Sequence, residues 1–328
     1  MERNYLKGAG LSVSNICLGA MTFGGQADEA ASRNMLDMAL DAGVNFVDTA
    51  NIYTAGRSEE FLGRALKGRR DSVILATKAG MKKSAPAVTD PNEMGLSRRY
   101  LNQTVETSLK KLDTDYIDIF YLHKPDYNTP VEETLYAMAD LIRAGKIRYF
   151  GLSNFPAWLV ADIDNFCVTH GLPRPVIGEY VCNMITRGIE SELIPCLEKH
   201  SMGIAAYNPL AGGILTGKHQ WQEVPQGQHR FTLNKVYAGR YWKKENFDAV
   251  DQLKEIAAGC GYSIMEMAFA WCLFHKGVDT MILGASRPEQ LEANLAAVEK
   301  IQPLPADALA AIDNIWKGLS QDRFPYFY

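Results

Sequence analysis

Eight short apolar runs alternate with amphipathic stretches along this chain, and the alternation limits its possible folds more than any single motif does. The runs have the length of β-strands and cover residues 14–18, 45–49, 72–77, 116–122, 149–153, 176–180, 203–207 and 280–283. Helical apolar spacing covers residues 27–42, 58–66, 97–112, 131–144, 157–170, 189–200, 264–276, 289–298 and 306–316. Continuously apolar strands joined by helical crossovers predict a parallel sheet that is covered on both faces.

Such units can form an open doubly wound sheet or a closed barrel. Eight βα units in 328 residues fit a closed (β/α)8 barrel, the TIM barrel. The open fold is expected to carry G-x-G-x-x-G after its first strand, but the chain reads GAMTFGG there. We therefore predict an α/β TIM barrel that forms a single domain over residues 1–328.

Two segments extend this plan. The start, NYLKGAGLSVSNICLG, predicts a short hairpin that turns at residues 7–10 and plugs the bottom of the barrel. Residues 218–246, after the seventh strand, lack clear periodicity, and the helical ranges given above include none between residues 200 and 264. A long excursion at this position is typical of a functional loop on the C-terminal face of a barrel.

Composition narrows the function. A net charge of −4 without a basic stripe argues against nucleic acid as a partner. Six cysteines without a C-x-x-C pair indicate reduced thiols and a cytoplasmic protein. The six histidines lack zinc-site spacing, so no metal is expected. No run approaches the roughly 18 apolar residues of a membrane span, so no membrane partner is expected.

Four ionisable residues lie where neighbouring strands should end. Asp48 follows the second run, Lys78 the third and His123 the fourth, while Tyr53 lies in the loop after Asp48. Each residue alone has an ordinary structural explanation, such as solvation for a lysine or packing for a tyrosine. In a (β/α)8 barrel, however, these strand ends meet at the face that carries active sites. The four residues together therefore predict a site that moves protons.

At these residues the chain resembles the aldo-keto reductase superfamily, nearly from end to end. The resemblance rests on GAMTFG, DAGVNFVDTANIYTAGRSEEFLGRAL, TKAG, SLKKLDTDYIDIFYLHKPD, GKIRYFGLSNF, AAYNPLAGGILTGK and ILGASRPEQLEANLAAVE. Within the superfamily the chain is most similar to the aflatoxin-aldehyde reductase branch. That second likeness rests on PVEETLYA, on TRGIESELIPCL at residues 186–197, and on RYW at residues 240–242.

The resemblance implies NADPH-dependent reduction of an aldehyde or ketone, by hydride transfer from the nicotinamide to the carbonyl carbon. Tyr53 would be the general acid, and His123 would donate a hydrogen bond to the carbonyl oxygen. Lys78, held by Asp48, would lower the pKa of Tyr53 from its ordinary value of about 10. Two alternatives use the same residues: an NAD(P)-dependent sugar or alcohol dehydrogenase, and a slow regulatory subunit that senses the cofactor.

The resemblance also implies a cofactor site. Ser153 and Asn154 would bond the carboxamide, and Tyr207 would stack on the nicotinamide. Arg287, before a helix that opens with Pro288, favours the 2′-phosphate of NADP(H), while NAD(H) is possible. The cofactor residues are expected to be Met21, Thr22, Asp48, Ser153, Asn154, Glu179, Tyr207, Asn208, Pro209, Leu210, Gly212, Lys218, Gly284, Ser286, Arg287, Gln290 and Asn294. The substrate residues are expected to be Phe23, Tyr53, His123 and Trp242 in an apolar, aromatic opening.

Some positions depart from the family pattern. Glu179 stands where many members have a glutamine that bonds the carboxamide, and Cys182 stands where the branch usually has an aromatic residue. In the adenosine site, Gly284 and Gln290 replace a lysine and an arginine found in some branches. The expected partner is a small carbonyl compound, and the protein is expected to be a monomer or a homodimer.

Overall fold

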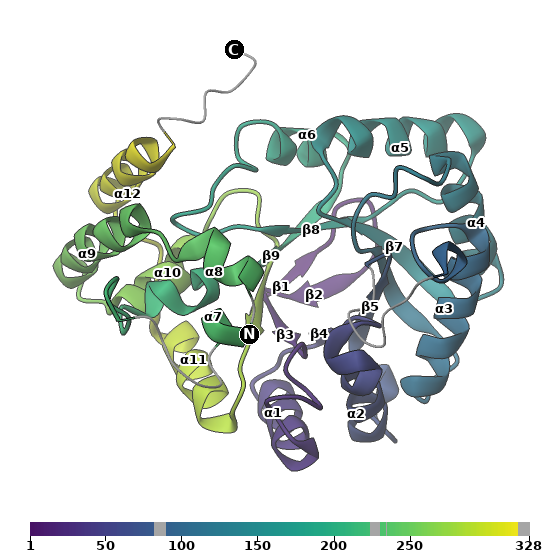
Figure 1. Ribbon diagram of the computed structural model, residues 1–328, viewed down its shortest axis with the longest axis horizontal. Helices are drawn as coiled ribbons and strands as arrows, with labels where there is room; N and C mark the ends of the chain where they lie inside the picture. The colour runs from purple at the N-terminus through teal and green to yellow at the C-terminus, as the bar shows by residue number, and fades with distance from the viewer. Residues whose placement is uncertain (82–89, 224–229, 234, 321–328) are drawn as a thin grey trace.

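Eight parallel strands close into a barrel surrounded by helices in the computed structural model, which describes residues 1–81, 90–223, 230–233 and 235–320 (Figure 1). The strands are β3 (Ile16–Gly19), β4 (Phe46–Asp48), β5 (Ile74–Ala79), β6 (Ile117–Leu122), β7 (Ile147–Ser153), β8 (Ile177–Val181), β9 (Gly203–Tyr207) and β10 (Thr280–Gly284). Each strand pairs with the next along the chain, and β10 closes the ring between β9 and β3. The predicted TIM barrel is confirmed.

The surrounding helices begin at residues that satisfy free backbone N–H groups. The Asp28 carboxylate accepts from Ala31 N at the start of α1 (Glu29–Asp41), and Ser97 caps α3 in the same way. Ser263 and Glu266 form a capping box at the start of α10. The other bounds are α2 (Arg57–Ala65), α3 (Arg98–Lys111), α4 (Val131–Arg143), α5 (Ala157–His170), α6 (Leu193–Lys199), α10 (Ile264–Leu273), α11 (Pro288–Lys300) and α12 (Ala306–Leu319).

The strands divide the core into an inner and an outer layer. In β6, Ile119 and Tyr121 face the barrel interior, whereas Phe120 and Leu122 pack in the larger cluster under the helices. This alternation follows from the two-residue period of a strand. It also assigns Lys78 to the interior, because Lys78 lies two residues after the inward-facing Ala76.

The N-terminal hairpin closes one end of the barrel. β1 (Arg3–Tyr5) pairs antiparallel with β2 (Ser12–Ser14), as the sequence predicts. Leu6 and Val13 belong to the interior cluster with Phe46 and Ile74, the first residues of β4 and β5. The hairpin therefore lies at the N-terminal ends of the strands, and the opposite end remains for a site.

The segment after β9 differs from the prediction. It contains the 3-10 turns η4 (Ala211–Thr216) and the helices α7 (Arg230–Leu233), α8 (Lys235–Tyr241) and α9 (Lys244–Gly259). The absence of a helix between residues 200 and 264 was therefore a wrong expectation. α9 buries Phe247, Val250, Leu253 and Ala257, whose spacing is helical and could have revealed it.

No single helix within the described ranges is long and apolar enough to cross a membrane. α9 and α10 reach the required length and composition only together, as a pair bent by 86°.

Candidate active site

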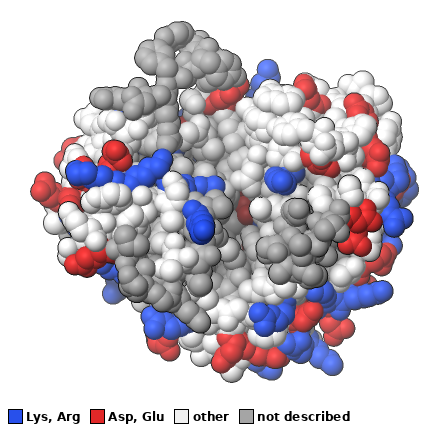
Figure 2. All heavy atoms as spheres, in the orientation of Figure 1, with Lys and Arg blue, Asp and Glu red and all other residues white. Residues whose placement is uncertain are grey.

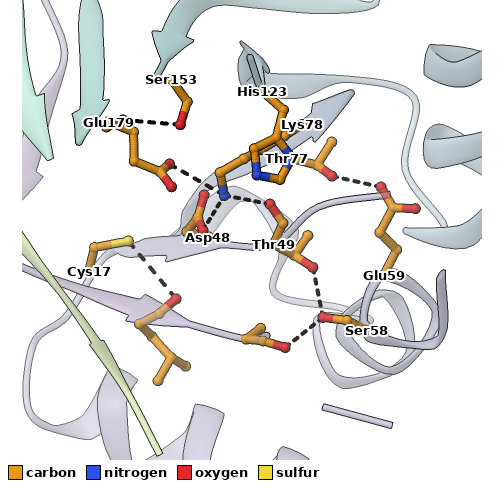
Figure 3. A network of polar contacts seen from close by, with 12 residues as sticks. Cys17, Asp48, Thr49, Ser58, Glu59, Thr77, Lys78, His123, Ser153 and Glu179 are labelled. Atoms are coloured by element: carbon orange, nitrogen blue, oxygen red, sulfur yellow. Dashed lines mark hydrogen bonds and ion pairs between the residues drawn. The ribbon is translucent and has the colours of Figure 1, made fainter. Parts of the chain in front are cut away.

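The structure brings the four predicted ionisable residues together at the C-terminal mouth of the barrel, and Figure 3 shows three of them, Asp48, Lys78 and His123. Asp48 ends β4, Lys78 lies near the end of β5, and His123 follows β6. Tyr53 opens the 3-10 turn η1 (Tyr53–Gly56). Its ring centre lies 5.3 Å from Lys78 Nζ and 6.0 Å from the imidazole of His123, to which it is nearly perpendicular.

Tyr53 is held by a constrained turn. Thr54, Ala55 and Gly56 have φ angles of 48°, 59° and 90°, a left-handed run that is costly at the two residues other than glycine. The hydroxyl of Thr54 donates to the carbonyl of Phe23 at 2.7 Å. This bond fixes the turn against the loop after β3, and with it the position of the phenol.

Lys78 carries the central charge of the site. Its ammonium donates to Asp48 and to the carbonyl of Thr49 at 2.9 Å, and it lies 3.3 Å from Glu179 Oε2. The three N–H groups of a lysine therefore have three oxygen partners. Burial alone would lower the pKa of Lys78, but the carboxylates of Asp48 and Glu179 raise it above its ordinary value. The side chain is thus a fixed, buried cation.

The pKa of the Tyr53 phenol differs from the prediction that Lys78 lowers it. Burial raises its pKa, the charge of Lys78 lowers it, and the carboxylates of Asp48 and Glu179 raise it again. The net result is a raised pKa, so the predicted lowering by Lys78 is outweighed. A phenol that keeps its proton is the form that a proton donor needs.

His123 is a neutral imidazole. Burial and the nearby charge of Lys78 lower its pKa to about 3. Its Nδ1 atom is buried and has no hydrogen-bond partner among the described residues. A neutral imidazole can donate one hydrogen bond and accept another, which suits it to orienting a carbonyl oxygen beside Tyr53.

The predicted nicotinamide residues form a second group at the same mouth. Asn154 donates to Ser153 Oγ at 2.9 Å and to the carbonyl of His123 at 3.0 Å. Tyr207, at the end of β9, donates to Asn154 Oδ1 at 2.8 Å. These bonds connect the ends of three strands, so the amide and the ring of Tyr207 are positioned before any ligand enters.

The segment after β9 makes a left-handed turn at the mouth. Ala211, Gly212 and Gly213 have φ angles of 49°, 71° and 112°, and the N–H groups of Ala211 and Gly213 donate to the carbonyls of Asn208 and Leu210 at 2.9 and 2.8 Å. Asn208 Nδ2 is buried without a hydrogen-bond partner in the described part of the chain. This unused amide donor fits an anionic group such as a pyrophosphate. Pro209 is buried, Leu210 is half-buried, and Lys218 is exposed.

The start of α11 fits a second phosphate group. Arg287 occupies the N-cap position, and Pro288 is the first helical residue, as the sequence predicts. Ser286 donates through its backbone N–H and its hydroxyl to Gln290 Oε1, at 3.1 and 2.9 Å. Arg287 and Gly284 are exposed, whereas Asn294 is buried in the next turns of the helix. Figure 2 shows a face hollowed near its centre, with basic side chains beside the hollow.

The structure does not bring all predicted residues to the opening. The ring of Phe23 is only 1% exposed and packs in the core, so it is not placed at an open substrate surface. Trp242 packs against Phe231 and Phe247, with ring centres 5.0 and 4.9 Å apart. Met21 is exposed, and the hydroxyl of Thr22 donates to the carbonyl of Ala285 at 2.5 Å.

Sequence reasoning missed one contact of the site. It assigned Glu179 to the cofactor, whereas the carboxylate also faces Lys78 across the barrel interior. The signal was its place in VIGEY, because a carboxylate inside a buried strand needs a charged or hydrogen-bonding partner. Among the described residues, no group of three or more histidine, cysteine or acidic side chains could hold a metal ion.

Comparison with known proteins places this geometry in a family. The model described as the aldo/keto reductase family matches residues 15–317. A protein of Arabidopsis thaliana named probable voltage-gated potassium channel subunit beta is 35% identical over 322 residues, which cover 96% of each chain. The human aldo-keto reductase family 7 member A3 is 37% identical over 327 residues, covering 94% of this chain and 96% of its own. The human aflatoxin B1 aldehyde reductase member 2 is 37% identical over 328 residues, covering 94% and 88%. The chain therefore belongs to the aldo/keto reductase family and is an NAD(P)H-dependent oxidoreductase.

Proposed function

We propose that this protein reduces an aldehyde or ketone to an alcohol with NADPH, and that Tyr53 is the proton donor. The observation that carries the proposal is the buried ammonium of Lys78 beside a protonated phenol and a neutral imidazole. The bound nicotinamide supplies the hydride. Relatives named aldehyde reductases support this class of substrate.

The protein residues handle the proton and the oxygen. The carbonyl oxygen would accept hydrogen bonds from Tyr53 and from His123, so that negative charge developing on it is stabilised. The proton of Tyr53 then moves to this oxygen, and the phenolate left behind lies beside the ammonium of Lys78. Since Asp48 and the carbonyl of Thr49 hold that ammonium, it stays in place while the charge moves.

The proposed preference for NADP(H) over NAD(H) rests on the start of α11. An exposed arginine at the N-cap combines a guanidinium with the positive end of the helix dipole, and both favour a phosphate. We therefore place the 2′-phosphate of NADP(H) at Arg287. Ser153, Asn154 and Tyr207 would hold the nicotinamide end.

The test is Tyr53→Phe, with Tyr5→Phe as the matched control. Tyr5 is 74% exposed on the hairpin at the other end of the barrel, so the same loss of a hydroxyl should change nothing there. We expect Tyr53→Phe to lower kcat/KM for aldehydes by at least about 100-fold, measured as loss of NADPH absorbance. Cofactor affinity, measured by fluorescence, should stay within about twofold. Full activity of Tyr53→Phe rules out the proposed role.

A second candidate is a regulatory subunit that binds the cofactor and turns over slowly. Relatives from plants and fission yeast are named potassium channel β subunits and match to a similar degree. Tight NADPH binding without turnover on a panel of aldehydes, ketones and dicarbonyls favours this function. Activity confined to NAD+ and a sugar favours a dehydrogenase.

A further inference from the structure

The barrel interior holds two carboxylates against one ammonium. Asp48 on β4 and Glu179 on β8 both point toward Lys78 Nζ, and all three side chains are at most 5% exposed (Figure 3). If both acids were ionised, this buried cluster would carry a net negative charge. Uncompensated charge is unfavourable in a buried site. The cluster is therefore a place where a proton can be held.

The contacts distinguish the two acids. Asp48 accepts a hydrogen bond from the ammonium, whereas Glu179 Oε2 lies 3.3 Å from Nζ in a longer ion pair. Glu179 is thus the more weakly held of the two. Burial and the charge of Asp48 raise the pKa of Glu179 to about 8, against the opposing effect of Lys78. The pKa of Asp48 is raised as well, but Asp48 accepts directly from the ammonium, so the contacts favour Glu179 as the site of the extra proton.

Other titratable groups face the same cluster. Cys17 on β3 and Tyr121 on β6 line the interior, and the pKa of each is raised, first by burial and then by the two carboxylates. Neither thiol nor phenol is charged near neutral pH under these shifts. His123 is neutral as well. Burial also raises the pKa of Asp48, against the opposing effect of Lys78, and it raises the pKa of Tyr207, which also faces Glu179, to about 12. Within this cluster, the longer contact of Glu179 with the ammonium makes it the group whose charge is assigned to change near pH 8.

We propose that Glu179 is a positioning residue that acts through Lys78, and that its ionisation sets the acidity of Tyr53. While Glu179 is protonated, the ammonium is balanced by Asp48 alone, and its field on Tyr53 is strongest. When Glu179 loses its proton, a second negative charge faces Lys78 and makes the phenol harder to ionise. Tyr53 then remains a proton donor to higher pH. This inference rests on the proposed role of Tyr53.

The consequence is a difference between the two directions of the reaction. Reduction needs the phenol, whereas oxidation of an alcohol needs the phenolate as a base. Ionised Glu179 favours the first form, so it extends reduction and delays oxidation as the pH rises. A merely structural Glu179 would leave these pH profiles unchanged.

The test compares Glu179→Gln with Glu59→Gln. Glu59 is also a buried carboxyl, but it lies on α2 and accepts from Thr77 Oγ1 at 2.7 Å, on the outer face of β5. In Glu179→Gln the ascending limb of kcat/KM for alcohol oxidation, where the phenolate of Tyr53 forms, should move about one pH unit toward acid, a tenfold gain below the midpoint. Glu59→Gln should leave the profile in place. An unchanged profile in Glu179→Gln overturns the proposal.

Infrared spectroscopy tests the proton itself, without turnover. In the wild-type protein a C=O stretch of a protonated carboxyl should be present at neutral pH and disappear as the pH passes about 8. Glu59→Gln should show the same band with the same pH dependence, and Glu179→Gln should lack it. Failure to find this band in the wild type overturns the proposal even if the variant does not fold. If Tyr53→Phe is fully active while the band titrates, the proposed function fails and the protonation of Glu179 stands.

Discussion

Both faces of β5 meet buried acids, one on the outer face and two on the inner face, and the faces differ in what surrounds those acids. On the outer face, Thr77 donates its hydroxyl to Glu59 at 2.7 Å, between the barrel and α2. On the inner face, the next residue, Lys78, meets Asp48 and Glu179. Both sites are closed to solvent, and Figure 3 shows them on opposite sides of one strand.

The difference teaches that a buried carboxyl alone does not mark a functional site. Burial raises the pKa of Glu59, and the hydroxyls of Thr77 and Ser108, together with the charge of Lys111, oppose that rise. The inner acids surround a cation that a phenol and an imidazole also face. The outer face lacks this combination of a fixed charge and neighbouring groups that can give or accept a proton.

Replacement of Lys78 tests the difference between the two faces of β5 most directly. Lys78→Met should lower kcat/KM for reduction by about 1,000-fold, because the phenolate that forms on Tyr53 loses its neighbouring positive charge. It should also lower the free energy of unfolding by about 3–5 kcal/mol, since two buried carboxyls lose their cation. Steady-state kinetics and urea unfolding measure both effects.

The matched control is Lys244→Met, which removes an exposed ion pair with Asp248 on α9. Such an exposed pair contributes little to stability, so neither the free energy of unfolding nor the activity should change measurably. Equal loss in the two variants would show that the inner cluster has no special role.

The outer face is tested by Thr77→Val, a change of similar shape that removes the donor to Glu59. We expect a loss of about 1–3 kcal/mol in the free energy of unfolding, because a buried acceptor is left unsatisfied. Activity should stay within about twofold, because Thr77 points away from the mouth. A large loss of activity with normal stability would mean that the two faces are coupled through β5.

The sequence predicted the barrel and the meeting of Asp48, Lys78 and His123 for one reason. Parallel strands put their carboxyl ends at one rim, so residues at successive strand ends are neighbours by geometry. The contact between Lys78 and Glu179 could not be found this way. β5 and β8 are not adjacent strands, and only closure of the barrel brings their inner faces together.

Other features needed the folded chain for different reasons. The pKa of Tyr53 depends on a sum of burial and three charges, whose signs are known from the sequence but whose sizes are not. Phe23 is an aromatic residue of the kind that often lines a substrate pocket, but its ring packs in the core. In contrast, α9 was visible in the spacing of its apolar residues, and its omission was avoidable.

The smallest expected effect is the change in kcat/KM with pH that would come from protonation of His123. Burial and Lys78 lower the pKa of His123 to about 3, so the imidazole is neutral throughout the range from about pH 5 to 7. The kcat/KM for reduction should therefore change less than about twofold across that range. A profile that falls with a midpoint near the ordinary histidine pKa of about 6.5 would show that the charge of Lys78 is not felt at His123.

The lowered pKa of His123 also makes the stability of the folded protein depend on pH. The unfolded chain binds a proton at His123 below about pH 6.5, whereas the folded chain does so only near pH 3, so folding loses stability as the pH falls between these values. Each unit of the shift corresponds to about 1.4 kcal/mol. His123→Gln should remove this acid sensitivity in urea unfolding at pH 4 to 7, and His170→Gln, at an exposed position on α5, should keep it. Equal acid sensitivity in the wild type and in His123→Gln would place the cause outside the inner face of the barrel.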